Sequence, residues 1–179
     1  MRVMKTELPG CLLIEPEIFG DHRGWFYESY SERKLPELKV KFIQDNHSYT
    51  KQKGTIRGIH FQKPPATQAK LVRCTRGAVK AAAVDLRAAS ETFKRWILVE
   101  LSAENKRMLF LPFGFGAGFV TLTDDVEFMY KVDNYYSPAD ERGICWNDPD
   151  LAVDWGITEP ILSEKDAKAP FLRDSDLDF

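Results

Sequence analysis

The sequence predicts an all-β domain of the sandwich, barrel or jelly-roll type. Three observations support this fold class. Short runs rich in β-branched and aromatic residues alternate with turn residues between positions 40 and 135, helical patterns are short and peripheral, and a hydrophobic fraction of 44% over 179 residues can fill one sizeable core. Composition stays even up to an acidic tail, LRDSDLDF, so we expect a single domain over residues 1–179.

Eight segments carry the strand signal. In chain order they are KFIQDN (41–46), TIRGIHFQ (55–62), AKLVRCTRG (69–77), AVKAAAVDLR (78–87), RWILVELS (95–102), RMLFLPFGFG (107–116), GFVTLT (118–123) and VEFMYKV (126–132). SERKLPELKV (31–40) starts with a serine cap but contains Pro36, which predicts only a short helix. A second short helix is expected to begin at Ser163 in SEKDAKAP and to end before Pro170.

Charge and apolar patterning exclude several classes of partner. The formal net charge of −2 and the pI near 6.0 provide no basic field for nucleic acid, although a local group of Lys and Arg could hold a small anion. The longest apolar run near the N-terminus, residues 11–14, is far too short for a signal segment or a membrane span. We therefore expect a soluble cytoplasmic protein that binds neither nucleic acid nor membranes.

The three cysteines are expected to be reduced thiols. Cys11, Cys74 and Cys145 are odd in number, far apart and without the paired spacing of a zinc or redox motif. Buried free thiols of this kind are typical of cytoplasmic proteins.

Strand alternation brings two polar side chains toward the expected interior, and a third lies on a neighbouring segment. It places Tyr130 on the apolar face of residues 126–132 and Lys70 on the same face as Val72, while His60 lies within residues 55–62. Each residue alone is more simply explained as a structural one with its polar atom satisfied. Together, on successive strands, they could enclose one ligand cavity at the mouth of a small barrel.

Two further features of the same region bear on this cavity. Arg57 would face away from His60 unless Gly58 forms a β-bulge, which glycine in a strand often marks. A metal site needs several converging ligands, and His22, His47 and His60 lie apart in the sequence. We therefore expect no metal.

Several blocks of the sequence, in order, resemble those of the dTDP-4-dehydrorhamnose 3,5-epimerase family. The resemblance covers residues 10 to 172 and implies a double-stranded β-helix (jelly roll) of the cupin type, a homodimer that exchanges N-terminal strands, no metal or other cofactor, and a dTDP-4-keto-6-deoxy sugar as substrate. Supply of deoxy sugars for a cell surface is the usual role of this family. The blocks are FGDHRGWFYESY, FIQDNHSYT, GTIRGIHFQKPPATQAKLVRC, VDLR, LSAENKRMLFLPFGF, VEFMYKVDNYYSPADERGICWNDPDL and ILSEKDAKAP.

The resemblance also implies roles for individual residues. In the family's reaction a 4-keto group acidifies the protons on C3 and C5, and inversion needs proton-transfer groups on opposite faces of the ring. His60 would be the base, supported by the carboxylate of Asp166, and Lys70 would stabilise the enolate oxygen. Tyr130 matches the proton donor on the far face.

The nucleotide would be held by a second set of residues. Tyr136 is expected to stack on the base, and arginine suits the diphosphate because guanidinium binds its oxygens in a bidentate way. The remaining residues implied for binding are Arg23, Glu28, Gln44, Asp45, Asn46, Arg57, Glu141 and Lys165.

Two positions depart from the family's pattern. Ala117 in GFGAGF stands where the family has an active-site histidine, and Ala81 stands where members commonly carry an aspartate. Neutral drift in a working 3,5-epimerase, altered specificity or a mono-epimerase, and loss of activity with retained sugar-nucleotide binding are the three explanations. A metal-dependent cupin oxygenase, from a further class, would require stoichiometric iron or manganese.

Overall fold

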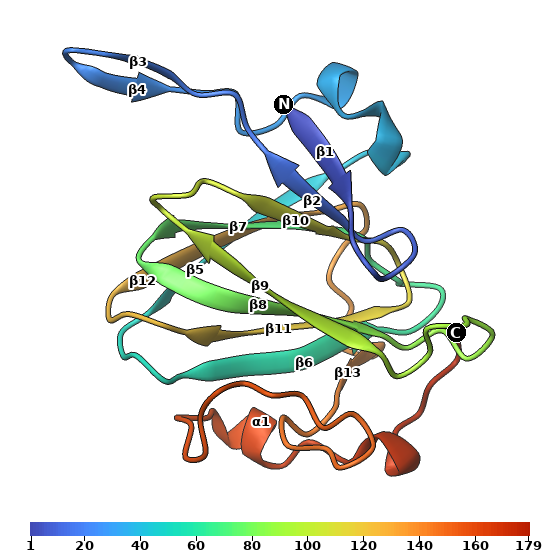
Figure 1. Cartoon of the computed structure of the whole chain (residues 1–179). Coiled ribbons are helices and arrows are strands. Elements are labelled where there is room, and N and C mark those ends of the chain that lie inside the picture. Colours follow the sequence, from blue (N-terminus) through green and yellow to red (C-terminus); the bar gives the residue numbers. More distant parts are fainter.

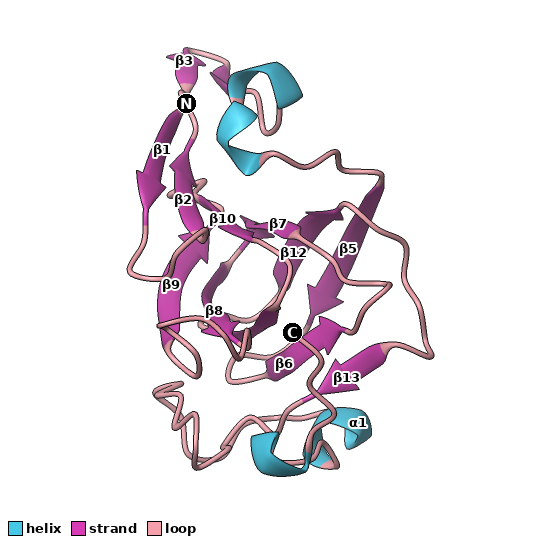
Figure 2. Cartoon of the chain, turned by 90° about the vertical axis from the view of Figure 1, so that its right-hand side faces the viewer, coloured by secondary structure: helices cyan, strands magenta, loops and turns pink.

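The computed structural model describes residues 1–179 and consists mainly of two antiparallel sheets that face each other (Figure 1). The six-stranded sheet has the order β1-β2-β10-β7-β12-β5, and the five-stranded sheet has the order β13-β6-β11-β8-β9. From β5 to β8, and again from β9 to β12, consecutive strands alternate between the two sheets. Seen from the side, the strands close into a barrel-like ring (Figure 2). The all-β prediction is confirmed.

The expected strands are all present, with shifted ends. They are β5 (Gln44–Thr50), β6 (Ile56–Gln62), β7 (Lys70–Arg76), β8 (Ala78–Asp85), β9 (Trp96–Ser102), β10 (Met108–Leu111), β11 (Phe115–Thr121) and β12 (Val126–Val132). The expected strand over residues 107–116 is divided, because Pro112 has no N–H to donate and Gly114 turns the chain at a φ of 81°.

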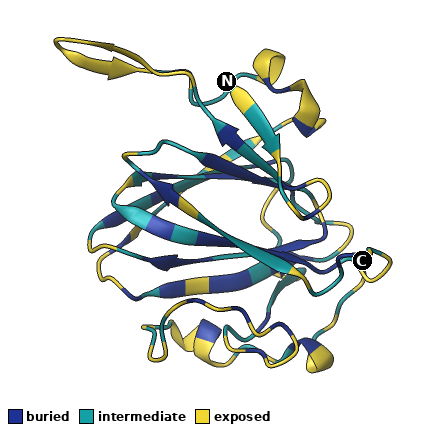
Figure 3. Ribbon diagram, viewed as in Figure 1, coloured by how far each residue is buried: buried dark blue, intermediate teal, exposed yellow.

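Local sequence patterns did not indicate five short strands. Strands β1 (Arg2–Lys5) and β2 (Leu12–Glu15) extend the six-stranded sheet, and β13 (Glu141–Gly143) extends the other sheet beside β6. Strands β3 (Phe19–Asp21) and β4 (Gly24–Phe26) form a hairpin that projects away from the barrel and is exposed throughout (Figure 3). Strands of three or four residues are too short for alternation to reveal them.

The helical segments are short and peripheral, as predicted. Around Pro36 the chain forms two 3-10 turns, η1 (Glu32–Lys34) and η2 (Pro36–Leu38), in place of one helix. The second predicted helix is α1 (Glu164–Ala167), which begins after Ser163 as expected. A further 3-10 turn, η3 (Leu172–Asp174), follows it. No helix is long and apolar enough to cross a bilayer.

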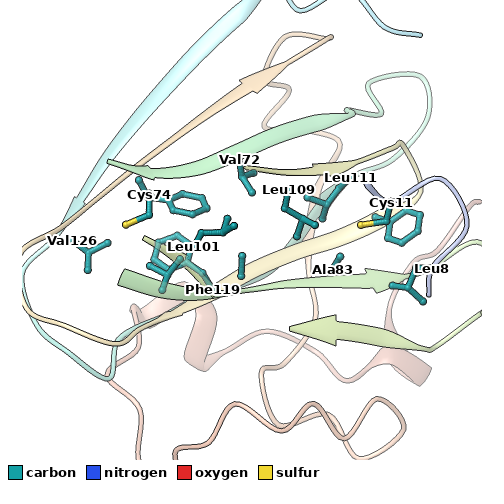
Figure 4. Packing of buried hydrophobic residues seen from close by; sticks show 14 residues of the cluster. Leu8, Cys11, Val72, Cys74, Ala83, Leu101, Leu109, Leu111, Phe119 and Val126 are labelled. Atoms are coloured by element: carbon teal, nitrogen blue, oxygen red, sulfur yellow. The ribbon is translucent and has the colours of Figure 1, made fainter. Parts of the chain in front are cut away.

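The main hydrophobic core lies between the two sheets (Figure 4). On β12 the predicted alternation is confirmed, since Val126, Phe128 and Val132 are buried. Cys11 and Cys74 belong to this core, and burial raises the pKa of their thiols to about 12 and about 11. Both thiols therefore stay protonated and behave as apolar side chains.

A second core attaches the C-terminal segment to the outer face of the five-stranded sheet. Trp155 and Leu151 pack there with Ile59 and Phe61 of β6. The backbone of Ile161 adds two hydrogen bonds, accepting from Ile56 N–H at 3.0 Å and donating to the Gly54 carbonyl at 3.0 Å. These contacts hold α1 beside β6.

A buried carboxylate fixes the loop that follows β8. Asp85 is fully buried and accepts hydrogen bonds from Arg87 Nε at 2.8 Å, Ser90 Oγ at 2.6 Å and Thr92 Oγ1 at 2.6 Å. Burial alone would raise the pKa of Asp85, but the hydrogen bonds from Arg87, Ser90 and Thr92 outweigh it and lower the pKa to about 2. Arg87 also donates to the Pro9 carbonyl, which ties the N-terminal segment to this loop.

This network predicts a pH-dependent part of the stability. Because the folded-state pKa of Asp85 lies below the ordinary value of 3.8, the stabilisation is complete above about pH 4 and is lost as the pH falls toward 2. Asp85→Asn should lower the free energy of unfolding at pH 7 by about 2 kcal/mol. Urea unfolding should show the difference shrinking at pH 3. Glu159→Gln, at an exposed and unpaired carboxylate, is the control, and an equal loss at both pH values would contradict the expectation.

Candidate active site

One cavity of about 310 Å³ opens between the sheets and α1. Polar groups from β6, β7, β12 and α1 line one part of it, and small or apolar side chains, from β8 and β11 and also from β7, β10 and β12, line the rest. The lining residues are Ser48, Arg57, His60, Lys70, Val72, Ala81, Ala82, Leu111, Ala117, Gly118, Phe119, Phe128, Tyr130, Ser163, Lys165 and Asp166. All four predicted catalytic residues are among them.

A β-bulge at Gly58 places Arg57 and His60 on the same side of β6. On the neighbouring strand β11, Ala117 lies opposite His60 and Phe119 lies opposite Arg57. Two steps along β11 thus match three steps along β6, which is a shift of register. Gly58 has a φ of 118°, and a Cβ there would lie 2.6 Å from the Gly118 Cα. Only glycine fits, and the bulge on which the common orientation of Arg57 and His60 depends is present.

The imidazole of His60 is bonded to the carboxylate of Asp166. His60 Nε2 lies 2.5 Å from Asp166 Oδ1, and the two side chains are 29% and 5% exposed. The residues are 106 positions apart and meet because the C-terminal segment packs under β6. The sequence resemblance, and no local pattern, predicted this pair.

The charge state of Asp166 decides which nitrogen of His60 is free. Burial would raise the pKa of Asp166, but its hydrogen bonds and charge interaction with His60, with help from Ser163 and the Gly58 backbone, lower it. An ionised carboxylate only accepts, so Nε2–H of His60 is the donor. Nδ1 then carries the lone pair that can take a proton.

Lys70 on β7 and Tyr130 on β12 line the cavity from the six-stranded sheet. Burial lowers the pKa of Lys70 to about 8, and the charge of Glu141 opposes this shift only in part. Burial, followed by the charge of Glu141, raises the pKa of Tyr130. Near pH 7 the phenol is therefore protonated and the ammonium is still largely charged.

Arg57 is oriented by two hydrogen bonds from one side of its guanidinium group. Its Nε donates to Thr50 Oγ1 at 3.0 Å, and one terminal nitrogen donates to the Tyr49 carbonyl at 3.0 Å. Thr50 is buried, so this support is fixed. The other terminal nitrogen remains available to an anion in the cavity.

Three of the predicted binding residues form one cluster beside the cavity. Glu141 on β13 accepts from Tyr136 Oη at 2.7 Å and pairs with Lys165 Nζ at 2.5 Å. Burial opposes ionisation of Glu141, but Lys165 and Tyr136 outweigh it and lower the pKa. Tyr136 is 54% exposed, so its ring is accessible to a planar group.

The predicted binding residues of β5 are divided between two faces of the sheet. Gln44 and Asn46 lie on the same face of β5 as Ser48, which lines the cavity. Gln44 Nε2 donates to Asn46 Oδ1 at 2.9 Å. Asp45 lies on the outer face, where Lys131 Nζ contacts it at 2.8 Å. The structure does not bring Asp45 to the cavity, since strand alternation separates it from its neighbours.

Arg23 and Glu28 also lie outside this cavity. Arg23 is at the tip of the β3–β4 hairpin and pairs with Asp21 at 2.6 Å, and Glu28 pairs with Lys34. The hairpin extends away from the barrel that holds His60 (Figure 1). Within one chain, these two residues and the cavity remain apart.

The two departures from the family's pattern both lie in the cavity wall. Ala81 and Ala117 contribute methyl groups where the resemblance implies a carboxylate and an imidazole. Ser48 and Ser163 are lining residues that the sequence analysis did not assign, although alternation on β5 could have indicated Ser48. No group of three or more His, Cys, Asp or Glu side chains converges in the structure.

Comparison with known proteins agrees with this geometry. The sequence model of the family described as dTDP-4-dehydrorhamnose 3,5-epimerase matches residues 5–174. The dTDP-4-dehydrorhamnose 3,5-epimerase of Salmonella typhimurium is 52% identical over 176 residues, which cover 96% of each chain. The solved structure of the Bacillus anthracis enzyme of that name, with TDP and PPi bound, is 48% identical with a TM-score of 0.93, covering 96% of this chain and 99% of that one.

Two further solved structures are informative about ligands. A dTDP-6-deoxy-D-glucose-3,5-epimerase from Legionella pneumophila, in complex with dTDP-4-keto-L-rhamnose, is 44% identical with a TM-score of 0.93, covering 98% of this chain and 94% of that one. A 3'-monoepimerase from Streptomyces bikiniensis, in complex with dTDP-quinovose, is 36% identical with a TM-score of 0.87, covering 94% and 86%. The jelly-roll prediction is confirmed, and the chain belongs to the dTDP-4-dehydrorhamnose 3,5-epimerase family.

Proposed function

We propose that the protein epimerises a dTDP-4-keto-6-deoxyhexose at C3 and C5 through an enolate. The observation that carries this proposal is the hydrogen bond between His60 and the buried Asp166, in a cavity that Lys70 and Tyr130 also line. These groups are the base, the charge stabiliser and the acid that inversion next to a ketone requires. The named activities of the similar proteins support the same reaction.

Proton removal is assigned to His60. With Nε2–H donated to the carboxylate of Asp166, Nδ1 accepts the proton from a carbon next to the C4 ketone. The imidazolium that forms is stabilised by the adjacent anion, which needs no rearrangement because it is already ionised and in place.

Enolate stabilisation and proton return are assigned to the opposite sheet. The ammonium of Lys70 would offset the charge that develops on the C4 oxygen, in a cavity where partial burial strengthens the interaction. The phenol of Tyr130, whose raised pKa keeps it protonated, would return a proton to the opposite ring face. The stereocentre is then inverted.

The nucleotide is assigned to the polar residues around the cavity. Arg57 would bind diphosphate oxygens, with Gln44, Asn46 and Lys165 as further donors. The exposed ring of Tyr136 would stack on the base.

A homodimer would account for the projecting hairpin. Phe19, Trp25 and Phe26 are 54%, 61% and 66% exposed, which is unusual for aromatic side chains on one small element. Docking of this hairpin on a second copy would bury them. It would also bring Arg23 and Glu28 toward the nucleotide site of that copy, where the sequence resemblance implies a role for them.

Deuterium incorporation tests the reaction directly. Incubation with dTDP-4-keto-6-deoxyglucose in deuterated water should add two deuterium atoms per sugar, counted by mass spectrometry, because each inversion takes its proton from exchangeable groups. A single deuterium would identify a mono-epimerase, the activity named for one similar protein. No incorporation would contradict the proposal.

The same assay tests the base. His60→Ala should reduce exchange by on the order of 10² to 10⁴-fold, the usual contribution of a positioned base. His47→Ala is the matched control, since His47 lies on the outer face of β5 with its ring against Glu127. Equal exchange in the His60 variant and the control would remove His60 from the mechanism.

Binding of dTDP tests the role of Arg57. Arg57→Lys keeps the charge but loses the planar group held by Thr50 and Tyr49, so we expect the affinity to fall about tenfold. Isothermal titration calorimetry measures it. Arg76→Lys is the control, because Arg76 is exposed and pairs weakly with Glu127 at 3.9 Å. A similar small effect in both variants would exclude Arg57 as a phosphate ligand.

The lowered pKa of Lys70 can be measured without substrate. After reductive methylation, the NMR signal of Lys70 should titrate with a midpoint near the pKa of about 8, against about 10.4 for a solvated lysine. Loss of the signal in Lys70→Arg assigns it and separates it from the N-terminal amine. Turnover should decline as the pH rises through the same range, because a neutral amine cannot stabilise an enolate. A midpoint above pH 10 would show that burial does not shift this group.

A further inference from the structure

We infer that Ser163 is a positioning residue for the His60–Asp166 pair. The inference rests on the proposed function, because it explains how the assigned base is kept aligned. Ser163 lines the cavity and is the N-cap of α1, the element that carries Asp166. It acts through Asp166 and not on the sugar.

The cap accounts for much of the order in α1. This helix has four residues, and Asp166 N–H donates to Ser163 Oγ at 3.1 Å while Ala167 N–H donates to the Ser163 carbonyl at 2.9 Å. A helix of one turn has few internal hydrogen bonds and is marginal without tertiary support. Both bonds from its first turn end on Ser163.

The side chain of Asp166 departs from the arrangement that its sequence spacing predicts. In a capping box the serine caps the N–H of the fourth residue, and an acidic or amide side chain at that position returns to the N–H of the serine. Here the first half of this capping box is present, but the carboxylate contacts His60 Nε2 at 2.5 Å. Ser163 thus fixes the backbone of Asp166, and its side chain also helps to lower the pKa of the carboxylate that contacts His60.

Neighbouring contacts hold the chain on both sides of Ser163 and α1. Two residues before it, Ile161 is hydrogen-bonded to Ile56 and Gly54 on the strand edge. After α1, the Pro170 carbonyl accepts from Cys145 N–H at 2.8 Å. Between these anchors, the α1 turn, the pair of Lys165 with Glu141 at 2.5 Å and the Gly58 backbone hold Asp166, whose side chain is 5% exposed and has little freedom. A small rotation of the turn would lengthen the bond to His60.

The experiment compares Ser163→Ala with Ser163→Thr. We expect the alanine variant to lower kcat about tenfold with KM changed less than twofold, and threonine, which also caps, to restore kcat. Ser163→Gly also lacks the hydroxyl but costs a helix N-terminus little stability, so it tests the same point if the alanine variant folds poorly. Ser31→Ala is the matched control, since Ser31 precedes a 3-10 turn with no side-chain cap bond.

A second measurement is independent of turnover. The His60 Nε2 proton, bonded to a buried carboxylate, should give a far-downfield NMR signal that exchanges slowly in the wild type and in Ser163→Thr. It should broaden or vanish in Ser163→Ala and Ser163→Gly. Asp166→Asn provides the reference for its loss.

The outcomes separate the inference from the proposed function. An unchanged signal and kcat in the alanine and glycine variants, or a loss that threonine does not restore, would overturn the role of Ser163. A raised KM with normal kcat would also overturn it, because the serine would then contact substrate. If the wild type shows the signal but no turnover, the proposed function fails while the positioning of His60 is still tested.

Discussion

The hydrogen bond between His60 and Asp166 is the interaction on which the site depends. A carboxylate that is 5% exposed is costly to bury unless a partner satisfies it, and the imidazole is that partner. The same bond determines the tautomer of the imidazole and so selects Nδ1 for chemistry. The bond that makes burial of Asp166 tolerable is therefore the same bond that orients His60. The packing of the C-terminal segment under β6 is needed for both.

Strand periodicity predicted which face of the strand several cavity-lining residues occupy. Alternation along β12 and β7 placed Tyr130 and Lys70 inward, and glycine at position 58 indicated the bulge that brings Arg57 round to the side of His60. These are local rules that act over two or three residues. The order of strands in the barrel follows from pairing over long distances and is not contained in such rules.

Other parts of the site depend on contacts that local patterns cannot show. Asp166 reaches His60 only through the second core, and family resemblance was needed to connect residues so far apart. For Asp45 the local pattern was informative and the resemblance was not. The resemblance assigned Gln44, Asp45 and Asn46 to binding together, but strand alternation places Asp45 on the opposite face, where it contacts Lys131. The strands β1 to β4 and β13 are too short to carry a period.

The proposed acid and the proposed base come from different sheets. His60 stands on the five-stranded sheet, whereas Tyr130 and Lys70 stand on the six-stranded one, and the hydrocarbon layer between them includes Phe119 and Phe128, whose ring centres are 4.4 Å apart. The gap that a sugar ring must fit is thus a property of core volume. A substitution that adds or removes a methylene in that layer would change the separation of the proposed acid and base, although it contacts neither of them.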